Sequence, residues 1–285
     1  MNKKKKIFSK FILLCVLFGV CSGIFGQNLK VTYCLDFIPN AKKPLIKREI
    51  FQLHTSSEKK MSVYKSFSRM ISDSLYSEVN AGKPVDESHI PQYATKDFII
   101  KSYIDKDIKH YYHFNSSYFA LKRRISFQWK VIPNETKRIL DYLCKKAITS
   151  FGGRDWEVWY SPDIPVHDGP YVFGQLPGLI LEVKSADGEY HYQAIGLQEE
   201  RKDIIIEKKV AWVKDREHLI RLKKDYIKSP SATARQEDLQ YGISGAVVNG
   251  QKIDLEEGYR LLDRELWDWM EENNNSIEKD DIWVR

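Results

Sequence analysis

The chain has 285 residues, of which 42% are hydrophobic and 29% charged, and its formal net charge at pH 7 is +6. Its 15 glycines and 10 prolines exclude a collagen-like or low-complexity chain. Five lysines and no acidic residue lie in the first ten positions, so loss of this end would lower the net charge to +1. A near-neutral chain has no overall attraction for a phosphate backbone, which argues against a nucleic-acid partner.

Residues 1–26 are predicted to be a secretory signal peptide. Lysines at 3–6 precede an apolar run over 11–20, and small residues follow near 23–26. The run is about half the ~20 residues that span a bilayer. We therefore expect an exported protein of the periplasm or cell envelope that begins at Gln27 and has no transmembrane segment. Neither Cys15 nor Cys21 follows a small residue, which disfavours a lipoprotein.

Two cysteines, Cys34 and Cys144, remain after the predicted cleavage. In an oxidising compartment they are a candidate disulfide. The alternative is that each is a small buried hydrophobic residue. Spacing alone favours neither. Two cysteines without a CxxC motif are too few for a zinc site.

The next part of the chain reads as antiparallel β structure. Strands are predicted over 28–38, 47–55, 62–67, 98–104, 111–114 and 118–131, with a helix over 68–80. One hairpin is predicted around Gly152-Gly153, and a second joins 179–184 to 190–195 through Asp187-Gly188. These elements define a β domain over 27–198.

The composition changes after residue 198. An edge strand is predicted over 203–208, and charged helices over 217–228 and 254–273. Asp254 is the expected N-cap of the second helix, with Glu257 as its capping-box partner. Residues 229–250 are rich in loop-forming residues. We therefore expect residues 199–285 to be a charged, helix-containing extension of a mainly antiparallel β protein of the α+β class.

A set of residues in the stretch 129–197 carries a resemblance to a known family: 135–137, Tyr142, Cys144, Lys146, Ala147, Phe151, Gly153, Arg154, Trp159, Tyr160, Ile164, Pro165, Gly169, Pro170, Phe173 and 176–180. In the order and spacing of these residues the stretch resembles the GLPGLI family of exported Bacteroidetes proteins. Gln175 stands where that family has the first glycine of its hexapeptide, so a turn there must be made differently if it needs a positive φ. The resemblance implies an envelope protein with a curved sheet or half-barrel, and no catalytic activity is established for the family.

The hexapeptide-like segment 176–180 has two interpretations. Pro177-Gly178 suits a turn that leads into a buried strand, and this structural role is favoured. The alternative is a rigid loop that binds a partner. Trp156 and Trp159 are three residues apart and should face opposite sides of a strand, so one is expected to be more exposed or covered by the C-terminal helices. The candidate loop residues are Arg154, Trp159, Tyr160, Pro165, Gly169, Pro170, Leu176, Pro177, Gly178, Leu179 and Ile180.

The sequence contains no recognised catalytic motif, so no catalytic residue is predicted. The alternative function is a hydrolase that uses His167 as a base with Asp163 or Asp168. For Arg154, a role in pairing with a carboxylate or a loop carbonyl is favoured.

No metal or cofactor is expected. His110 and His113 should point to opposite faces of a strand, so they would not converge on one ion. The predicted function is a non-enzymatic envelope protein that holds an apolar ligand, a peptide or a partner protein. An open sheet interior would favour ligand binding, and a filled one a structural or surface-interaction role.

Overall fold

Alternation of side chains along the first strand sets the pattern of the whole fold. In β1 (Asn28–Phe37) every second residue is buried, as expected for a strand with one face on a core. The computed structural model describes residues 28–86, 88, 90–91, 97–115, 117–200, 210–248 and 250–284. The predicted signal peptide lies outside these residues, and so does the predicted edge strand over 203–208.

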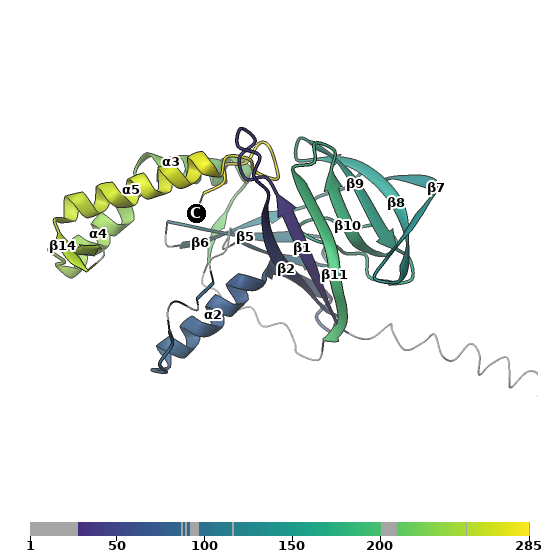
Figure 1. Cartoon of the computed structure of the whole chain (residues 1–285), viewed down its shortest axis with the longest axis horizontal. Coiled ribbons are helices and arrows are strands. Elements are labelled where there is room, and N and C mark those ends of the chain that lie inside the picture. The colour runs from purple at the N-terminus through teal and green to yellow at the C-terminus, as the bar shows by residue number, and fades with distance from the viewer. Residues whose placement is uncertain are drawn as a thin grey trace, which may run out of the picture.

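In the described part of the chain, twelve strands form one curved, unclosed sheet (Figure 1). Their order is β12-β6-β5-β4-β3-β2-β1-β11-β10-β9-β8-β7. All neighbours are antiparallel except β12 and β6. The predicted fold class is confirmed. The remaining strands are β2 (Lys47–Ser56), β3 (Met61–Ser66), β4 (Phe98–Ser102), β5 (Ile108–Phe114), β6 (Ser117–Arg123), β7 (Lys130–Ile139), β8 (Tyr142–Phe151), β9 (Arg154–Ser161), β10 (Leu179–Ser185), β11 (Tyr190–Glu200) and β12 (Ala211–Val213).

Both predicted hairpins form. Gly152 and Gly153 join β8 to β9 with φ angles of 62° and 77°, the left-handed values that a two-residue hairpin turn requires. Asp187-Gly188 lies in the turn between β10 and β11. The pairing of β1 with β11 then joins the N-terminal strands to this second half of the sheet.

Two predicted segments differ from the structure. The strand expected over 118–131 is two strands, because the chain leaves the sheet at 124–129. There the backbone N–H of Phe127 donates to the side chain of Gln175, and its ring stacks on Phe173. The predicted loop 229–250 contains a helix and a strand, since its residues 232–240 are mostly good helix formers.

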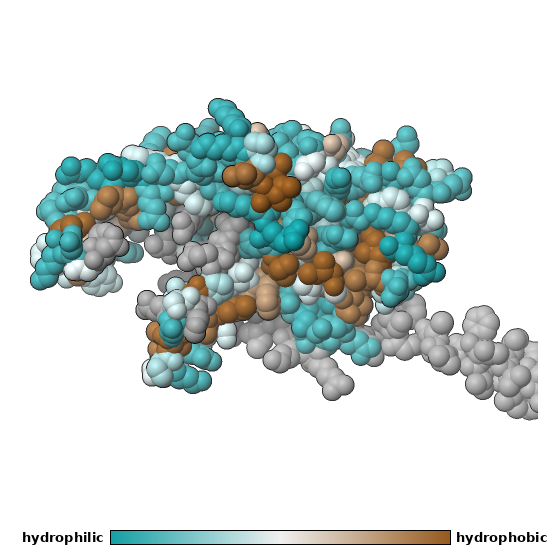
Figure 2. All heavy atoms as spheres, in the orientation of Figure 1, coloured by the Kyte–Doolittle hydropathy of each residue, from teal (hydrophilic) through white to brown (hydrophobic). Residues whose placement is uncertain are grey.

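The helices lie outside the sheet. α2 (Phe67–Asn80) begins at Ser66, whose side chain accepts a hydrogen bond from the N–H of Arg69. The helical arm consists of α3 (Arg216–Lys228), α4 (Ala232–Tyr241), the small hairpin β13 (Ala246–Val248) and β14 (Gln251–Ile253), and α5 (Leu255–Glu272). Asp254 is the N-cap of α5, as predicted. Its side chain accepts a hydrogen bond from the backbone N–H of Glu256. Hydrophilic residues line the outward edge of the arm (Figure 2).

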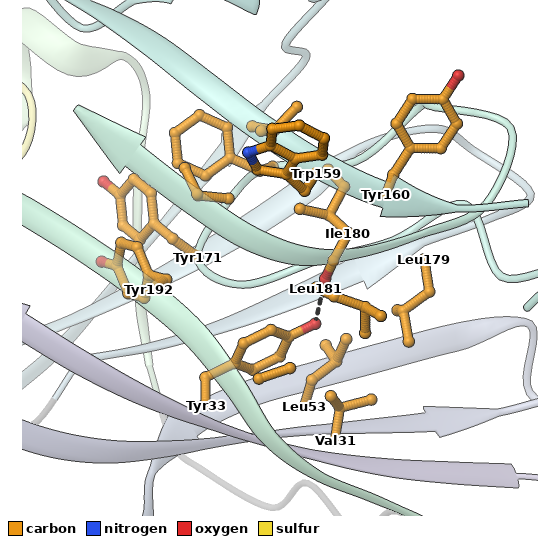
Figure 3. Packing of buried hydrophobic residues seen from close by; sticks show 14 of the residues in the cluster. Val31, Tyr33, Leu53, Trp159, Tyr160, Tyr171, Leu179, Ile180, Leu181 and Tyr192 are labelled. Carbon is orange, nitrogen blue, oxygen red and sulfur yellow. Dashed lines mark hydrogen bonds between the residues drawn. The ribbon is translucent and has the colours of Figure 1, made fainter. Parts of the chain in front are cut away.

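The main hydrophobic core lies inside the curve of the sheet. It joins side chains of β1 and β2 to those of β9, β10 and the 162–178 loop. The hydroxyl of Tyr33 donates to the carbonyl of Ile180 at 2.7 Å, which links β1 to β10 across this interior (Figure 3). A second cluster lies between β5, β6 and the arm, and includes Leu219 and Phe114. The interior is therefore largely filled by the protein's own side chains.

Candidate functional site: a cavity beneath the C-terminal segment

The loop 162–178, which connects β9 to β10, crosses the inner face of the sheet. Its buried Asp168 accepts hydrogen bonds from Ser62 Oγ at 2.5 Å and from Tyr103 Oη at 2.8 Å. It also pairs with Lys101 Nζ at 2.5 Å. Ser62 and Lys101 lie on β3 and β4, several strands away from β9 and β10. The loop therefore holds the two halves of the curved sheet together.

Lys101 is fully committed to this loop. Its ammonium donates to Asp168 and to the carbonyl oxygens of Gly169 at 2.7 Å and Phe173 at 3.1 Å, which uses all three of its protons. Burial lowers its pKa, and the nearby Asp168 charge opposes that shift. Because both charged groups are saturated with partners, this cluster positions the loop and offers no group for chemistry.

Most of the candidate loop residues pack into the core. Leu176, Leu179 and Ile180 are at most 2% exposed. This burial supports the structural interpretation of the segment. Arg154, Trp159, Tyr160, Gly169, Pro170 and Gly178 are also buried, whereas Pro165 and Pro177 are exposed.

Three positions in this loop have a positive φ, Tyr171, Gln175 and Gly178, and the last two lie at the hexapeptide-like segment. Gly178 has φ +148°, and a Cβ there would lie 2.1 Å from the carbonyl oxygen of Ser161, so only glycine fits. Gln175, at the position where the resemblance to the GLPGLI family expects a glycine, itself takes φ +70°. Its side chain donates to Ile125 O at 2.6 Å and accepts from the N–H of Phe127 at 3.2 Å. These two hydrogen bonds hold Gln175 in the turn, although it lacks the conformational freedom of a glycine.

One tryptophan of β9 is more exposed than the other, as expected, but both are buried. Trp156 is 1% and Trp159 8% exposed. Trp159 does face the other side of the sheet, but lysines cover it, with Lys137 Nζ 4.4 Å and Lys146 Nζ 5.7 Å from its ring centre. Long lysine side chains can shield an aromatic ring while their charge stays in water.

A C-terminal strap, residues 273–284, returns from α5 onto the sheet. Arg154 holds it by donating to Asn275 Oδ1 at 2.7 Å and to the carbonyl oxygens of Ser276 and Ile277 at 2.9 and 3.0 Å. The same guanidinium pairs with Asp187 and Glu189. Arg154 thus has the predicted role, pairing with carboxylates and loop carbonyls.

Glu278 is the second anchor of the strap. Its carboxylate accepts hydrogen bonds from Nη1 and Nη2 of Arg123, each at 2.7 Å, and from the hydroxyl of Tyr171 at 2.6 Å. Arg216 Nη1 lies 3.3 Å away, and the Glu278 side chain is only 4% exposed. The predicted C-terminal extension is therefore joined to the β domain by its last residues, although the boundary at 198 stays a prediction.

A cavity of about 110 Å³ lies between the sheet and the strap. This is room for about three to four water molecules. Tyr171 and Tyr192 project to the same side of the core in Figure 3, and both line the cavity. The sheet also contributes Tyr64, Tyr112, Tyr190, Glu49 and His110, and the strap contributes Ser276, Ile277, Asp281, Ile282 and Trp283.

His110 Nδ1 and Tyr112 Oη are two of the polar atoms in the cavity wall that lack partners in the part of the chain that the structure describes. His110 and Tyr112 are 4% and 2% exposed, and their rings stack with centres 4.0 Å apart. Among the described residues, neither His110 Nδ1 nor Tyr112 Oη has a hydrogen-bond partner. Burial, with the charges of Arg123 and Lys223, lowers the pKa of His110 well below its usual value, so the imidazole is neutral. A neutral imidazole and a phenol offer both donors and acceptors to a bound molecule.

The candidate catalytic residues do not converge. His167 and Asp163 are exposed, while Asp168 points into the core toward Lys101. His110 and His113 also separate as predicted, since the first packs on Tyr112 and the second on Tyr118. The described residues contain no group of histidine, cysteine and carboxylate side chains that could hold a metal ion.

The candidate disulfide between Cys34 and Cys144 does not form, because both thiols are free. Cys34 is on β1 and Cys144 on β8, with three strands between them. At ~4.8 Å per strand they are roughly 19 Å apart, far beyond the ~7 Å that a disulfide spans. Burial raises the pKa of the Cys144 thiol to about 11. Cys144 is thus the small buried residue of the alternative interpretation.

The sequence analysis missed the residues that build this cavity. His110 and Tyr112 alternate on one face of β5, and a histidine in that otherwise apolar face was the available signal. Glu278 offered no such signal in the sequence, because the segment around it has the composition of a charged, solvated tail.

Comparisons with known proteins place the chain. The family described as "N-glycanase peptide, N-terminal domain" matches residues 54–219. Among solved structures, PNGF-II in a C2 crystal form aligns with 18% identity and a TM-score of 0.48, covering 68% of this chain. The chain spans 32% of that PNGF-II chain.

Two further solved structures are less similar. An uncharacterised conserved protein from Thermus thermophilus has 7% identity and a TM-score of 0.35, covering 66% of this chain and 90% of its own. A LolA superfamily protein from Nitrosomonas europaea has 9% identity and a TM-score of 0.27, covering 63% and 88%. No curated protein matches the chain. Because the matched range 54–219 is more than half of the sequence, the chain belongs to the family of N-glycanase peptide N-terminal domains.

Proposed function

We propose that the chain is an exported, non-enzymatic binding protein of the cell envelope, with the curved sheet as scaffold and the cavity beneath the strap as ligand site. The basic and apolar pattern of residues 1–26 and the resemblance to the GLPGLI family support export. None of the helices in the described ranges is long and apolar enough to cross a membrane. The family description names an N-glycanase as the protein that carries such a domain. We propose that a domain of this kind binds a ligand, while the glycanase chemistry belongs to another part of the protein that carries it.

The unpartnered polar atoms of His110 and Tyr112 carry this proposal. A buried polar atom without a partner costs ~1–3 kcal/mol, and a ligand that pairs with it recovers that free energy. The hydroxyl of Tyr171, in the same wall, is by contrast engaged with Glu278. The cavity is therefore built to receive a molecule with polar groups of its own.

The size of the cavity limits the ligand. An engineered apolar cavity of ~150 Å³ binds benzene, and this cavity holds about 110 Å³. A ring-sized molecule with a hydroxyl or amine therefore fits the cavity. A lipid chain or a peptide would need another surface, because the rest of the interior is filled.

Phenol and benzene are the probes that test the site. They have nearly the same shape, but only phenol can bond His110 and Tyr112. We expect phenol to raise the thermal unfolding midpoint more than benzene does, and Tyr112→Phe to reduce the difference while keeping the ring. Tyr160→Phe is the matched control, since Tyr160 lies outside the cavity and its hydroxyl points away from the core (Figure 3). Equal effects of both probes on the wild-type chain would contradict the proposal.

The alternative hydrolase gains no support from the geometry. His167 has neither carboxylate beside it in a cleft, since Asp163 is exposed and Asp168 is bonded to Lys101. Loss of a measured hydrolytic activity in His167→Ala would revive it. The mass of the native protein tests export, because a chain that begins at Gln27 is expected.

A further inference from the structure

The tip of the β1–β2 hairpin presents two aliphatic side chains to solvent. Residues 41–48 are all exposed, and within them Leu45 is 75% and Ile46 70% exposed. Single exposed hydrophobic residues are common and need no explanation. An adjacent pair at the end of a hairpin, held away from every core cluster, does.

The base of this tip is ordered by hydrogen bonds. The side chain of Asn40 donates to the carbonyl of Glu271 at 2.9 Å and accepts the N–H of Lys42 at 2.9 Å. The N–H of Lys43 donates to Asn40 O at 3.0 Å. Leu45 and Ile46 therefore project from a fixed turn.

Cations flank the aliphatic pair on both sides in the sequence Lys42-Lys43-Pro44-Leu45-Ile46-Lys47-Arg48. Lys43 pairs with Glu272 and Arg48 with Asp36, and these cations are more than half exposed. Such surface pairs are weak and exchange readily. Lys42 and Lys47 form no ion pair within the described residues.

We propose that this tip docks on an anionic lipid surface, with Leu45 and Ile46 inserted between head groups and the four cations against lipid phosphates. Aliphatic side chains enter the boundary between head groups and acyl chains, and nearby lysine and arginine residues add attraction to anionic lipid. A protein partner would instead need a matching acidic-rimmed pocket for a protruding tip.

Docking would bring the strap close to the membrane. The carbonyl oxygens of Ile38 and Pro39, at the foot of the tip, both accept hydrogen bonds from Asn275 of the strap. The inference does not depend on the cavity ligand, and failure of one leaves the other standing.

Flotation with lipid vesicles tests the docking. The protein, with its N-terminus checked by mass so that the apolar run 11–20 is absent, is mixed with phosphatidylcholine vesicles with and without phosphatidylglycerol. We expect binding to the anionic vesicles alone, weakened by salt. The double variant Leu45→Asp/Ile46→Asp should bind about tenfold or more weakly, equivalent to at least ~1.4 kcal/mol.

Two further variants separate the contributions. Lys42→Ala/Lys47→Ala should bind several-fold more weakly and depend less on salt. Leu239→Asp is the control, because Leu239 is 83% exposed on α4 and should bind as wild type does. Wild type that floats with neither vesicle, or an aspartate variant that floats as well as wild type, overturns the proposal. So does a photo-crosslinker at position 45 that captures a protein instead of lipid.

Discussion

Replacing Glu278 tests whether a single buried carboxylate fixes the C-terminal strap. Glu278→Ala removes two hydrogen bonds of 2.7 Å from Arg123 and one of 2.6 Å from Tyr171. It leaves the Arg123 side chain, which is only 14% exposed, without a carboxylate partner. Loss of one partner of a buried ion pair costs ~3–5 kcal/mol. We expect about 3 kcal/mol, the lower end, because Arg123 keeps some contact with water.

Urea denaturation measures this loss, and Asp280→Ala is the matched control on the same strap. Asp280 also pairs with an arginine, Arg216, but its side chain is 67% exposed. Removing an exposed pair should cost ~0–1 kcal/mol.

The strap could instead detach before the sheet unfolds, and local opening would then limit the global effect. In that case protease cleavage within 273–284 should accelerate in Glu278→Ala. If this variant matches Asp280→Ala in both measurements, Glu278 is not the anchor we infer.

Three other changes follow from the same contacts. Gly178→Val should cost at least about 3 kcal/mol in urea denaturation, since its Cβ would overlap a backbone carbonyl, whereas His167→Ala on the exposed loop should stay within ~0.5 kcal/mol; equal effects would refute the turn assignment. Asp168→Asn should cost ~3–5 kcal/mol by the same assay because the buried Lys101 loses its counter-charge, and a small loss would mean that water reaches the pair. The pKa of His110 is depressed in the folded chain, so as the pH falls the unfolded chain binds a proton at this residue first, near pH ~6.5. The free energy of unfolding should therefore decrease below that pH, by up to ~1.4 kcal/mol per pH unit. His110→Gln should flatten this decrease between pH ~7.5 and ~5.5, and an equally steep profile would contradict the assignment.

Local patterns predicted the local structure well. The hairpin at Gly152-Gly153 and the helix that begins at Asp254 were both predicted, because their signals lie within a few residues. A glycine pair permits left-handed backbone, and an aspartate caps free N–H groups whatever lies far away. The fold class followed from the alternation of apolar residues along each strand.

The buried polar contacts could not be predicted in this way. Ser62 and Asp168 are 106 residues apart, and Lys101 lies 67 residues from Asp168. Their partnership depends on strand order, which sequence spacing does not encode. The same limit left the candidate disulfide open, since Cys34 and Cys144 belong to strands that the sheet order separates. Acidic residues of the strap, Glu278 above all, read as solvated charge for the same reason.

Gln175 shows where sequence and structure can be connected residue by residue. The resemblance to the GLPGLI family places a glycine at this position, and a positive φ was the question that its absence raised. Left-handed backbone costs a residue other than glycine ~1–2 kcal/mol. The two hydrogen bonds of the Gln175 side chain, at 2.6 and 3.2 Å, contribute ~0.5–1.5 kcal/mol each. The stabilisation from these hydrogen bonds is similar to the cost of the left-handed backbone, so the turn forms with glutamine in place of glycine. What the loop across the sheet requires at position 175 is therefore the turn and not a glycine.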